Sequence, residues 1–205
     1  KKFQKADVVI LNVGEQQYPQ AYLKQVADEV CGAISEMDCN SIACYTVMNS
    51  ADAQAVKQNL AEKKPDLFII NFLSWHITPN VMHIIKDYRN VPLLIWGIGG
   101  KTDSTGKLHS PAAIAGITGF LPIVKEFGFH YKTILEKPNE AHQYREVKDY
   151  IHAVSCAKTI RSARIGLIGY ADMGLYTCAY DKTQLFNKLG IDIENYCGYE
   201  IADLM

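Results

Sequence analysis

The sequence predicts an α/β fold: a doubly wound parallel sheet of the flavodoxin- or Rossmann-like kind, followed by the start of a second α/β domain. Strand-sized apolar runs alternate along the chain with amphipathic stretches of helical period. Each of these strands is apolar throughout instead of alternating, which is typical of parallel strands covered on both faces. Right-handed crossovers between five such strands favour a strand order of about 2-1-3-4-5.

The first domain is expected over residues 1–160, where turn and breaker residues mark the elements. Pro19 opens the first helix at its first turn, Pro65 breaks the chain after the second, and Thr78 caps the third. Five strands are predicted, at Ala6–Val13, Ser41–Met48, Asp66–Phe72, Pro92–Trp96 and His130–Leu135. Helices are predicted from Pro19 to about Ile34, at Asp52–Lys63, from Thr78 to about Tyr88, at Pro111–Phe127, and, long and charged, from about Glu140 to Ile160.

The second domain is expected over residues 161–205. A strand at Arg164–Gly169 precedes a helix from about Tyr176 to Leu189, which Gly190 closes. A short strand, Ile191–Asn195, follows, and another helix begins near Tyr199. One strand–helix–strand unit cannot bury both faces of a parallel sheet. The chain is therefore expected to be the front part of a longer protein.

Composition narrows the classes of function. The 205 residues are 48% hydrophobic and 21% charged, which is ordinary for a globular protein. The net charge of −1 and the lack of long single-sign runs argue against a general nucleic-acid or anionic-membrane surface. The longest apolar runs are strand-sized, so no transmembrane helix is predicted. A cytoplasmic protein is expected.

The cysteines form neither a CxxC pair nor a zinc-type spacing. Buried free thiols in a reducing cytoplasm are the expected state. The six are Cys31, Cys39, Cys44, Cys156, Cys178 and Cys197.

Ligands of such sheets bind beyond the carboxyl ends of the strands. Four loops are predicted there, and polar and aromatic residues gather in them. The loops are Gly14–Tyr18, Leu73–Pro79, Gly97–Ser110 and Tyr170–Tyr176.

The glycine-rich loop partly matches a phosphate-binding loop. It contains Gly-Gly-Lys-Thr after a strand, but Ile95 stands where the first glycine of that motif belongs, and no helix is predicted directly after Thr102. Without a helix N-terminus the phosphate cradle is lost. The pattern instead favours a flexible loop bordering a substrate cleft, with Lys101 and Asp103 as polar contacts.

Trp75 and His76 are predicted at the tip of the third strand. Trp can stack on the apolar face of a sugar ring, and His can donate to hydroxyls or titrate near neutrality. A Trp packed on the sheet edge beside a solvent-facing His fits the pattern equally well. The remaining histidines lack ligand spacing, and the carboxylates of the long helix are expected to form a solvated face. No catalytic residue can be assigned from the pattern.

Three stretches together resemble the L-fucose/L-arabinose isomerase superfamily, which are manganese-dependent aldose–ketose isomerases. VGEQQY resembles the family's strand-one loop, with Gln16 at the position of a substrate-side glutamine. SWHITPNVM followed by PLLIW is similar to the Trp–His-type loop and the strand after it. The segment from Arg164 through Asp172-Met173 to Glu200 is similar to the start of the second domain, and Met173 matches a position in the sugar pocket.

The resemblance implies an isomerase that acts as a homo-oligomer, a trimer or hexamer, on a small sugar. Gln16, Trp75, His76, Lys101 and Met173 would bind substrate, while the Mn²⁺ ligands would lie beyond residue 205. This chain alone would be inactive.

The chain departs from the arabinose branch, which carries a histidine in the helix after the glycine-rich loop; Thr118 lies near that place here. WGIGG is closer to the fucose-like branch. A non-catalytic sugar-binding α/β module remains the alternative.

Overall fold

The computed structural model describes residues 3–102, 104–169 and 180–203, which belong to two units. The larger unit is Lys5–Val154, and the smaller one joins Lys1–Gln4 to Ser155–Met205. The predicted domain boundary at residue 160 falls inside the helix α5 (Tyr144–Arg161). In the part of the chain that the structure describes, no helix is long and apolar enough to cross a membrane.

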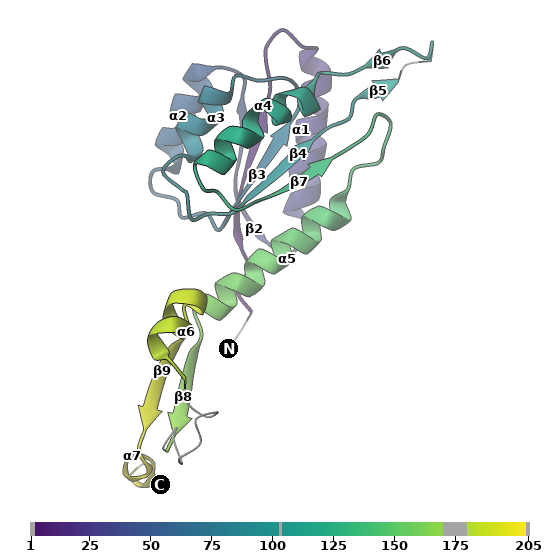
Figure 1. Cartoon of the computed structure of the whole chain (residues 1–205). Helices are drawn as coiled ribbons and strands as arrows, with labels where there is room; N and C mark the ends of the chain where they lie inside the picture. The colour runs from purple at the N-terminus through teal and green to yellow at the C-terminus, as the bar shows by residue number, and fades with distance from the viewer. Residues whose placement is uncertain (1–2, 103, 170–179, 204–205) are drawn as a thin grey trace. The chain divides into compact units, whose positions relative to one another are not determined.

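The larger unit is built on a five-stranded sheet in which every pairing is parallel, as predicted (Figure 1). Its order is β2-β1-β3-β4-β7. The predicted order was 2-1-3-4-5, and β7 is the fifth of the predicted strands. Two short strands inside the glycine-rich loop, β5 and β6, pair antiparallel as a hairpin that was not predicted. The strands are β1 (Asp7–Val13), β2 (Asn40–Val47), β3 (Leu67–Phe72), β4 (Leu93–Gly97), β5 (Lys101–Thr102), β6 (Leu108–His109) and β7 (Tyr131–Leu135).

Helices cover both faces of this sheet, so the doubly wound prediction is confirmed (Figure 1). One face packs against α2, α3 and α4, and the other against α1 and the first part of α5. Asn49 caps α2 by accepting a hydrogen bond from the Asp52 amide at 2.9 Å, so this helix begins before the predicted residue. The helices are α1 (Gln20–Ser35), α2 (Ser50–Leu60), α3 (Thr78–Ile85) and α4 (Ala113–Glu126).

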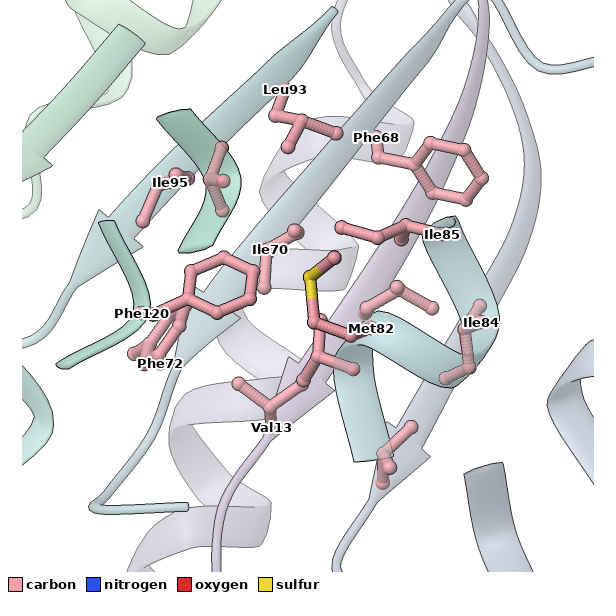
Figure 2. Close-up of a cluster of buried hydrophobic side chains, with 14 of the residues drawn as sticks. Val13, Phe68, Ile70, Phe72, Met82, Ile84, Ile85, Leu93, Ile95 and Phe120 are labelled. Atoms are coloured by element: carbon pink, nitrogen blue, oxygen red, sulfur yellow. The ribbon is translucent and has the colours of Figure 1, made fainter. Parts of the chain in front are cut away.

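The central strands supply the core because both of their faces are covered. All six residues of β3 and all five of β4 are buried. Phe68, Ile70 and Phe72 point to the face covered by α2, α3 and α4, where Phe120 and Met82 pack against them (Figure 2). Burying one such side chain contributes about 1.5–3 kcal/mol, so this layer is a large part of the stability.

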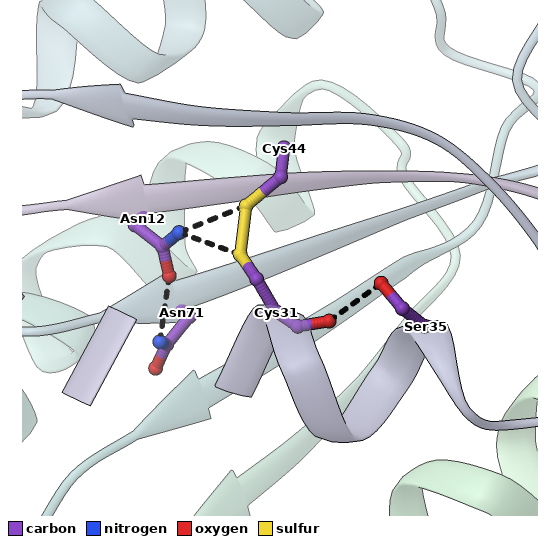
Figure 3. Close-up of a disulfide and its surroundings, with 5 residues drawn as sticks. All are labelled: Asn12, Cys31, Ser35, Cys44 and Asn71. Carbon is purple, nitrogen blue, oxygen red and sulfur yellow. Dashed lines mark hydrogen bonds between the residues drawn. A yellow bond between two sulfur atoms is a disulfide. The ribbon is translucent and has the colours of Figure 1, made fainter. Parts of the chain in front are cut away.

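One disulfide joins α1 to β2 and corrects the prediction that all six cysteines are free thiols. Cys31 and Cys44 are bonded, with their Cα atoms 6.6 Å apart (Figure 3). They meet because α1 packs on the sheet beside β1 and β2, a tertiary contact that sequence spacing does not reveal. The Asn12 amide lies against both sulfurs and accepts a hydrogen bond from Asn71 at 2.8 Å. Cys39 is a free thiol, and Cys178 lies outside the described residues.

The smaller unit pairs β8 (Arg164–Ile168) in parallel with β9 (Asp192–Tyr196). Between them runs α6 (Lys182–Leu189), and α7 (Gly198–Ala202) follows. The predicted strand–helix–strand order and the start of a further helix are confirmed, but α6 begins only at Lys182, with Asp181 as its cap, and the predicted start near Tyr176 lies outside the described residues. Gly190 ends α6 in the left-handed conformation, as predicted, with φ of 71°.

Candidate functional site

The carboxyl ends of the parallel strands meet at one edge of the sheet, where a cavity of about 370 Å³ opens. Tyr18 lines it from the loop before α1 and Tyr22 from the first turn of that helix, while Lys101 and Thr102 line it from β5. Two phenol rings thus lie beside an ammonium and a hydroxyl. This combination of apolar ring faces and hydrogen-bond donors suits a small polar molecule that has an apolar face.

A second cavity of about 220 Å³ shares Tyr22, Lys101 and Thr102 with the first. Its other wall comes from the segment after β7, which supplies Glu136 and His142. Because three residues line both cavities, the two adjoin each other and together make up the candidate site on the larger unit.

Hydrogen bonds hold the glycine-rich loop in place beside this site. The Oδ1 of Asn139 accepts a hydrogen bond from the Thr102 amide, and its Nδ2 donates to the Thr102 hydroxyl, each at 2.8 Å. The backbone amide of Asn139 donates to the carbonyl of Gly100. At Gly99 an added Cβ would lie 2.3 Å from the backbone of Lys137. Only glycine allows this close approach, which explains one of the two adjacent glycines.

Ser74 ties the strand-one loop to the strand-three loop. Its hydroxyl accepts a hydrogen bond from the Glu15 amide at 2.9 Å and donates to the carbonyl of Trp75 at 2.8 Å. The Trp75 amide in turn donates to the carbonyl of Pro111 at 2.8 Å. Two of the four loops predicted at the ligand edge, Gly14–Tyr18 and Leu73–Pro79, are therefore bonded to one another, whereas the predicted loop Tyr170–Tyr176 lies outside the described residues.

Glu136 and His142 form a hydrogen-bonded pair in the wall of the second cavity. Glu136 is only 1% exposed, and its Oε1 accepts hydrogen bonds from the Trp96 indole at 2.8 Å and from the Gln143 amide at 3.0 Å. Its Oε2 lies 2.9 Å from Nδ1 of His142. The hydrogen bond to Glu136 raises the pKa of His142 above its ordinary value, with burial opposing and the Glu29 carboxylate assisting.

The pKa of Tyr22 also responds to the carboxylates near His142. Burial is the main cause of its raised pKa, and the carboxylates of Glu136 and Glu29 add to it. Its phenol therefore stays protonated at neutral pH and can donate a hydrogen bond to a ligand.

The structure brings only some of the predicted site residues together. Lys101 lines both cavities, whereas Gln16 is exposed on the strand-one loop and Trp75 is 43% exposed on the strand-three loop. Neither Gln16 nor Trp75 lines these two cavities. Met173 and Asp103 lie outside the described residues.

His76 is buried, which corrects two expectations: that it faces solvent and that it titrates near neutrality. It is 4% exposed and packs edge-on against Phe72 and near Phe120. Within the described residues neither ring nitrogen has a hydrogen-bond partner. Burial lowers its pKa to about 4, so the ring is neutral at neutral pH and does not titrate there. The pattern did not reveal this because α4 covers the loop only in the folded chain.

Sequence reasoning missed Glu136, His142 and the two tyrosines. One signal was available: Glu136 directly follows the predicted fifth strand, at the edge where ligands bind. His142 carried no such signal, because its partner lies six residues back in an irregular segment.

A metal site is not formed by the described residues. Over residues 3–102, 104–169 and 180–203, no group of three or more His, Cys, Asp or Glu side chains could hold a metal ion. In comparisons with known proteins, neither a protein-family model nor a curated protein matches this chain.

Proposed function

We propose that this chain is the amino-terminal region of a Mn²⁺-dependent aldose–ketose isomerase that acts on an L-fucose- or L-arabinose-like sugar. In this proposal it contributes substrate-binding and oligomer-contact surface to a homo-oligomer. The observation that carries the proposal is the cavity at the carboxyl edge of the sheet, where Tyr18, Tyr22 and Lys101 converge. An aldose offers that cavity apolar C–H faces and several hydroxyls.

The described residues do not fit a manganese site, so in this proposal they hold no metal and take no part in a metal-dependent step. The residues of the first cavity can bind and orient a sugar. The phenol faces of Tyr18 and Tyr22 would pack on the ring, and the Lys101 ammonium and Thr102 hydroxyl would meet its hydroxyls. Such contacts fix the sugar relative to groups elsewhere in the protein.

One observation favours the alternative of a non-catalytic sugar-binding module. Both cavities are lined by residues of the larger unit alone. Titration of residues 1–205 with monosaccharides separates the two proposals. Micromolar binding without metal favours the module, whereas weak or absent binding favours the isomerase region.

The isomerase proposal is tested on the gene product that contains this chain, supplied with Mn²⁺ and a panel of aldopentoses and deoxyhexoses. We expect one aldose to be converted to its ketose, and Lys101→Met to raise KM about tenfold by removing a charge-assisted hydrogen bond. Lys24→Met, on the exposed side of α1, is the matched control and should leave KM unchanged. Lack of any ketose across the panel would contradict the proposal.

A further inference from the structure

We propose that His142 is an acid–base residue that opens the ring of a cyclic aldose bound in the second cavity, and that Glu136 positions it. This inference rests on the proposed function, because it takes the ligand to be a sugar. The resemblance to the isomerase superfamily assigns no role to either residue.

The hydrogen bonds around Glu136 fix the direction of the imidazole. The carboxylate is held by the Trp96 indole and the Gln143 amide through Oε1, which leaves Oε2 for Nδ1 of His142. The Glu136 amide also donates to the carbonyl of Gly97 at 3.0 Å, which anchors the residue to the end of β4. A carboxylate only accepts, so Nδ1 carries the proton and Nε2 is the basic nitrogen.

Aromatic rings restrict the imidazole further. Its centroid lies 5.8 Å from that of Trp96 and 5.6 Å from that of Tyr144, both in edge-on geometry. Nε2 lies 3.9 Å from Oε2 of Glu29, which is beyond hydrogen-bond length. His142 also lines the cavity that holds Lys101 and Tyr22. A carboxylate-oriented imidazole at the wall of a cavity is the arrangement that general acid–base catalysis uses.

The chemistry is the opening of a hemiacetal. Nε2 takes the proton from the anomeric hydroxyl O1 as the C1–O5 bond breaks and the C1=O1 double bond forms. The ring oxygen O5 takes a proton from a water molecule, and the imidazolium then gives its proton to the hydroxide that remains, which restores the water and the neutral imidazole. Atoms and protons balance, and no electrons leave the sugar. The reverse sequence closes the ring on either face, so the protein would accelerate exchange between anomers.

The surrounding charges set the pH dependence. Glu136, and after it Glu29 on α1, favour the imidazolium, whereas Lys101 opposes it. Tyr22 and Tyr144 also face this group and have raised pKa values. The base form of His142 therefore dominates only above a midpoint that is higher than that of a free imidazole. Anomer exchange should rise with pH through that midpoint.

The test measures anomer exchange of L-fucose and L-arabinose by NMR on the gene product that contains this chain, stripped of metal so that ketose formation does not contribute. We expect exchange well above the buffer rate. His142→Gln should lower the acceleration by about 100-fold, with the sugar Kd changed less than about threefold. His83→Gln, on the exposed face of α3, is the matched control and should keep the full rate.

Glu136→Gln should lower the midpoint of the pH profile, because the charge that favours the imidazolium is gone; a purely structural role would change the rate without moving the midpoint. If this variant fails to fold, the exchange rate of His142→Gln still tests the inference. Sugar binding with exchange at the buffer rate, or an unchanged rate in His142→Gln, would overturn the inference and leave the proposed function standing. If neither the metal-stripped nor the Mn²⁺-loaded protein shows saturable sugar binding, both the inference and the proposed function are contradicted.

Discussion

The imidazole of His76 meets the ring of Phe72 edge-on, with 4.5 Å between the ring centroids, in the layer between β3 and α4. Gly116 of α4 makes room for this arrangement, since a Cβ there would lie 3.3 Å from Nδ1 of His76. The ring is therefore enclosed by apolar groups and helix backbone, where a positive charge is poorly solvated.

This burial predicts a loss of stability in acid. The pKa of His76 is lowered to about 4 in the folded chain, against about 6.5 unfolded, so the unfolded state binds more protons between these values. The free energy of unfolding should therefore fall as pH drops from about 6.5 to about 4, by about 3 kcal/mol in total. Urea unfolding across this range measures it. His76→Leu should remove this part of the pH dependence and His83→Leu should not; an identical slope in both variants would refute the assignment.

Trp75 offers a test of sugar stacking outside the two cavities. If its exposed ring stacks on substrate, Trp75→Ala removes binding that is equal in the ground state and the transition state. KM should then rise by several fold, as expected for about 1 kcal/mol, while kcat changes less. Steady-state kinetics of the gene product with its best aldose measure both values. Ile77→Ala, in the same exposed loop, is the control. An unchanged KM with a collapsed kcat would rule out this role.

The Cys31–Cys44 bond predicts redox-dependent stability. It closes a loop with a sequence separation of 13 residues, and such a crosslink contributes about 3 kcal/mol by restricting the unfolded chain. Cys31→Ser should lower the free energy of unfolding by about that amount, and a dithiol reductant should lower it in the parent but not in the variant. Cys39→Ser is the matched control, since Cys39 is a free thiol. Equal stability with and without reductant would contradict the crosslink.

The backbone conformation of Gly190 predicts that a larger residue there would destabilise the smaller unit. Its φ of 71° is in the left-handed region, and an added Cβ would lie 3.1 Å from Cα of Arg161. Gly190→Ala should therefore destabilise the β8–β9 pair by about 1–2 kcal/mol. Gly198→Ala, where an added Cβ meets nothing within 4 Å, is the control. Amide hydrogen exchange in β8 and β9 should accelerate in the first variant only.

The parts of the fold set by local pattern were predictable. The buried strand β4 appears as an unbroken apolar run and β3 as a run interrupted only by Asn71, while proline and glycine mark helix ends through their backbone preferences. The side-chain caps were less predictable, because Asn49 caps α2 unforeseen and Thr78 does not cap α3. The strand order followed because right-handed crossovers leave few arrangements.

The features that depend on contacts between distant segments were not predictable. The β5–β6 hairpin has strands of two residues, too short for a periodic signal. The Cys31–Cys44 bond and the covering of His76 by α4 arise only when separate elements pack. At the candidate site, Lys101 was predicted from a loop motif, whereas the pairing of Glu136 with His142 needed the structure.

The hydrogen bond from the Trp96 indole to Glu136 gives the protein an internal optical probe. Trp96 is fully buried with its ring edge-on to His142, so we expect its fluorescence to change when that imidazole is protonated. The other tryptophan, Trp75, is exposed, so its emission is expected at longer wavelength than that of Trp96. The blue part of the emission should therefore follow the charge on His142, and the red part the surroundings of the strand-three loop, in one unlabelled sample.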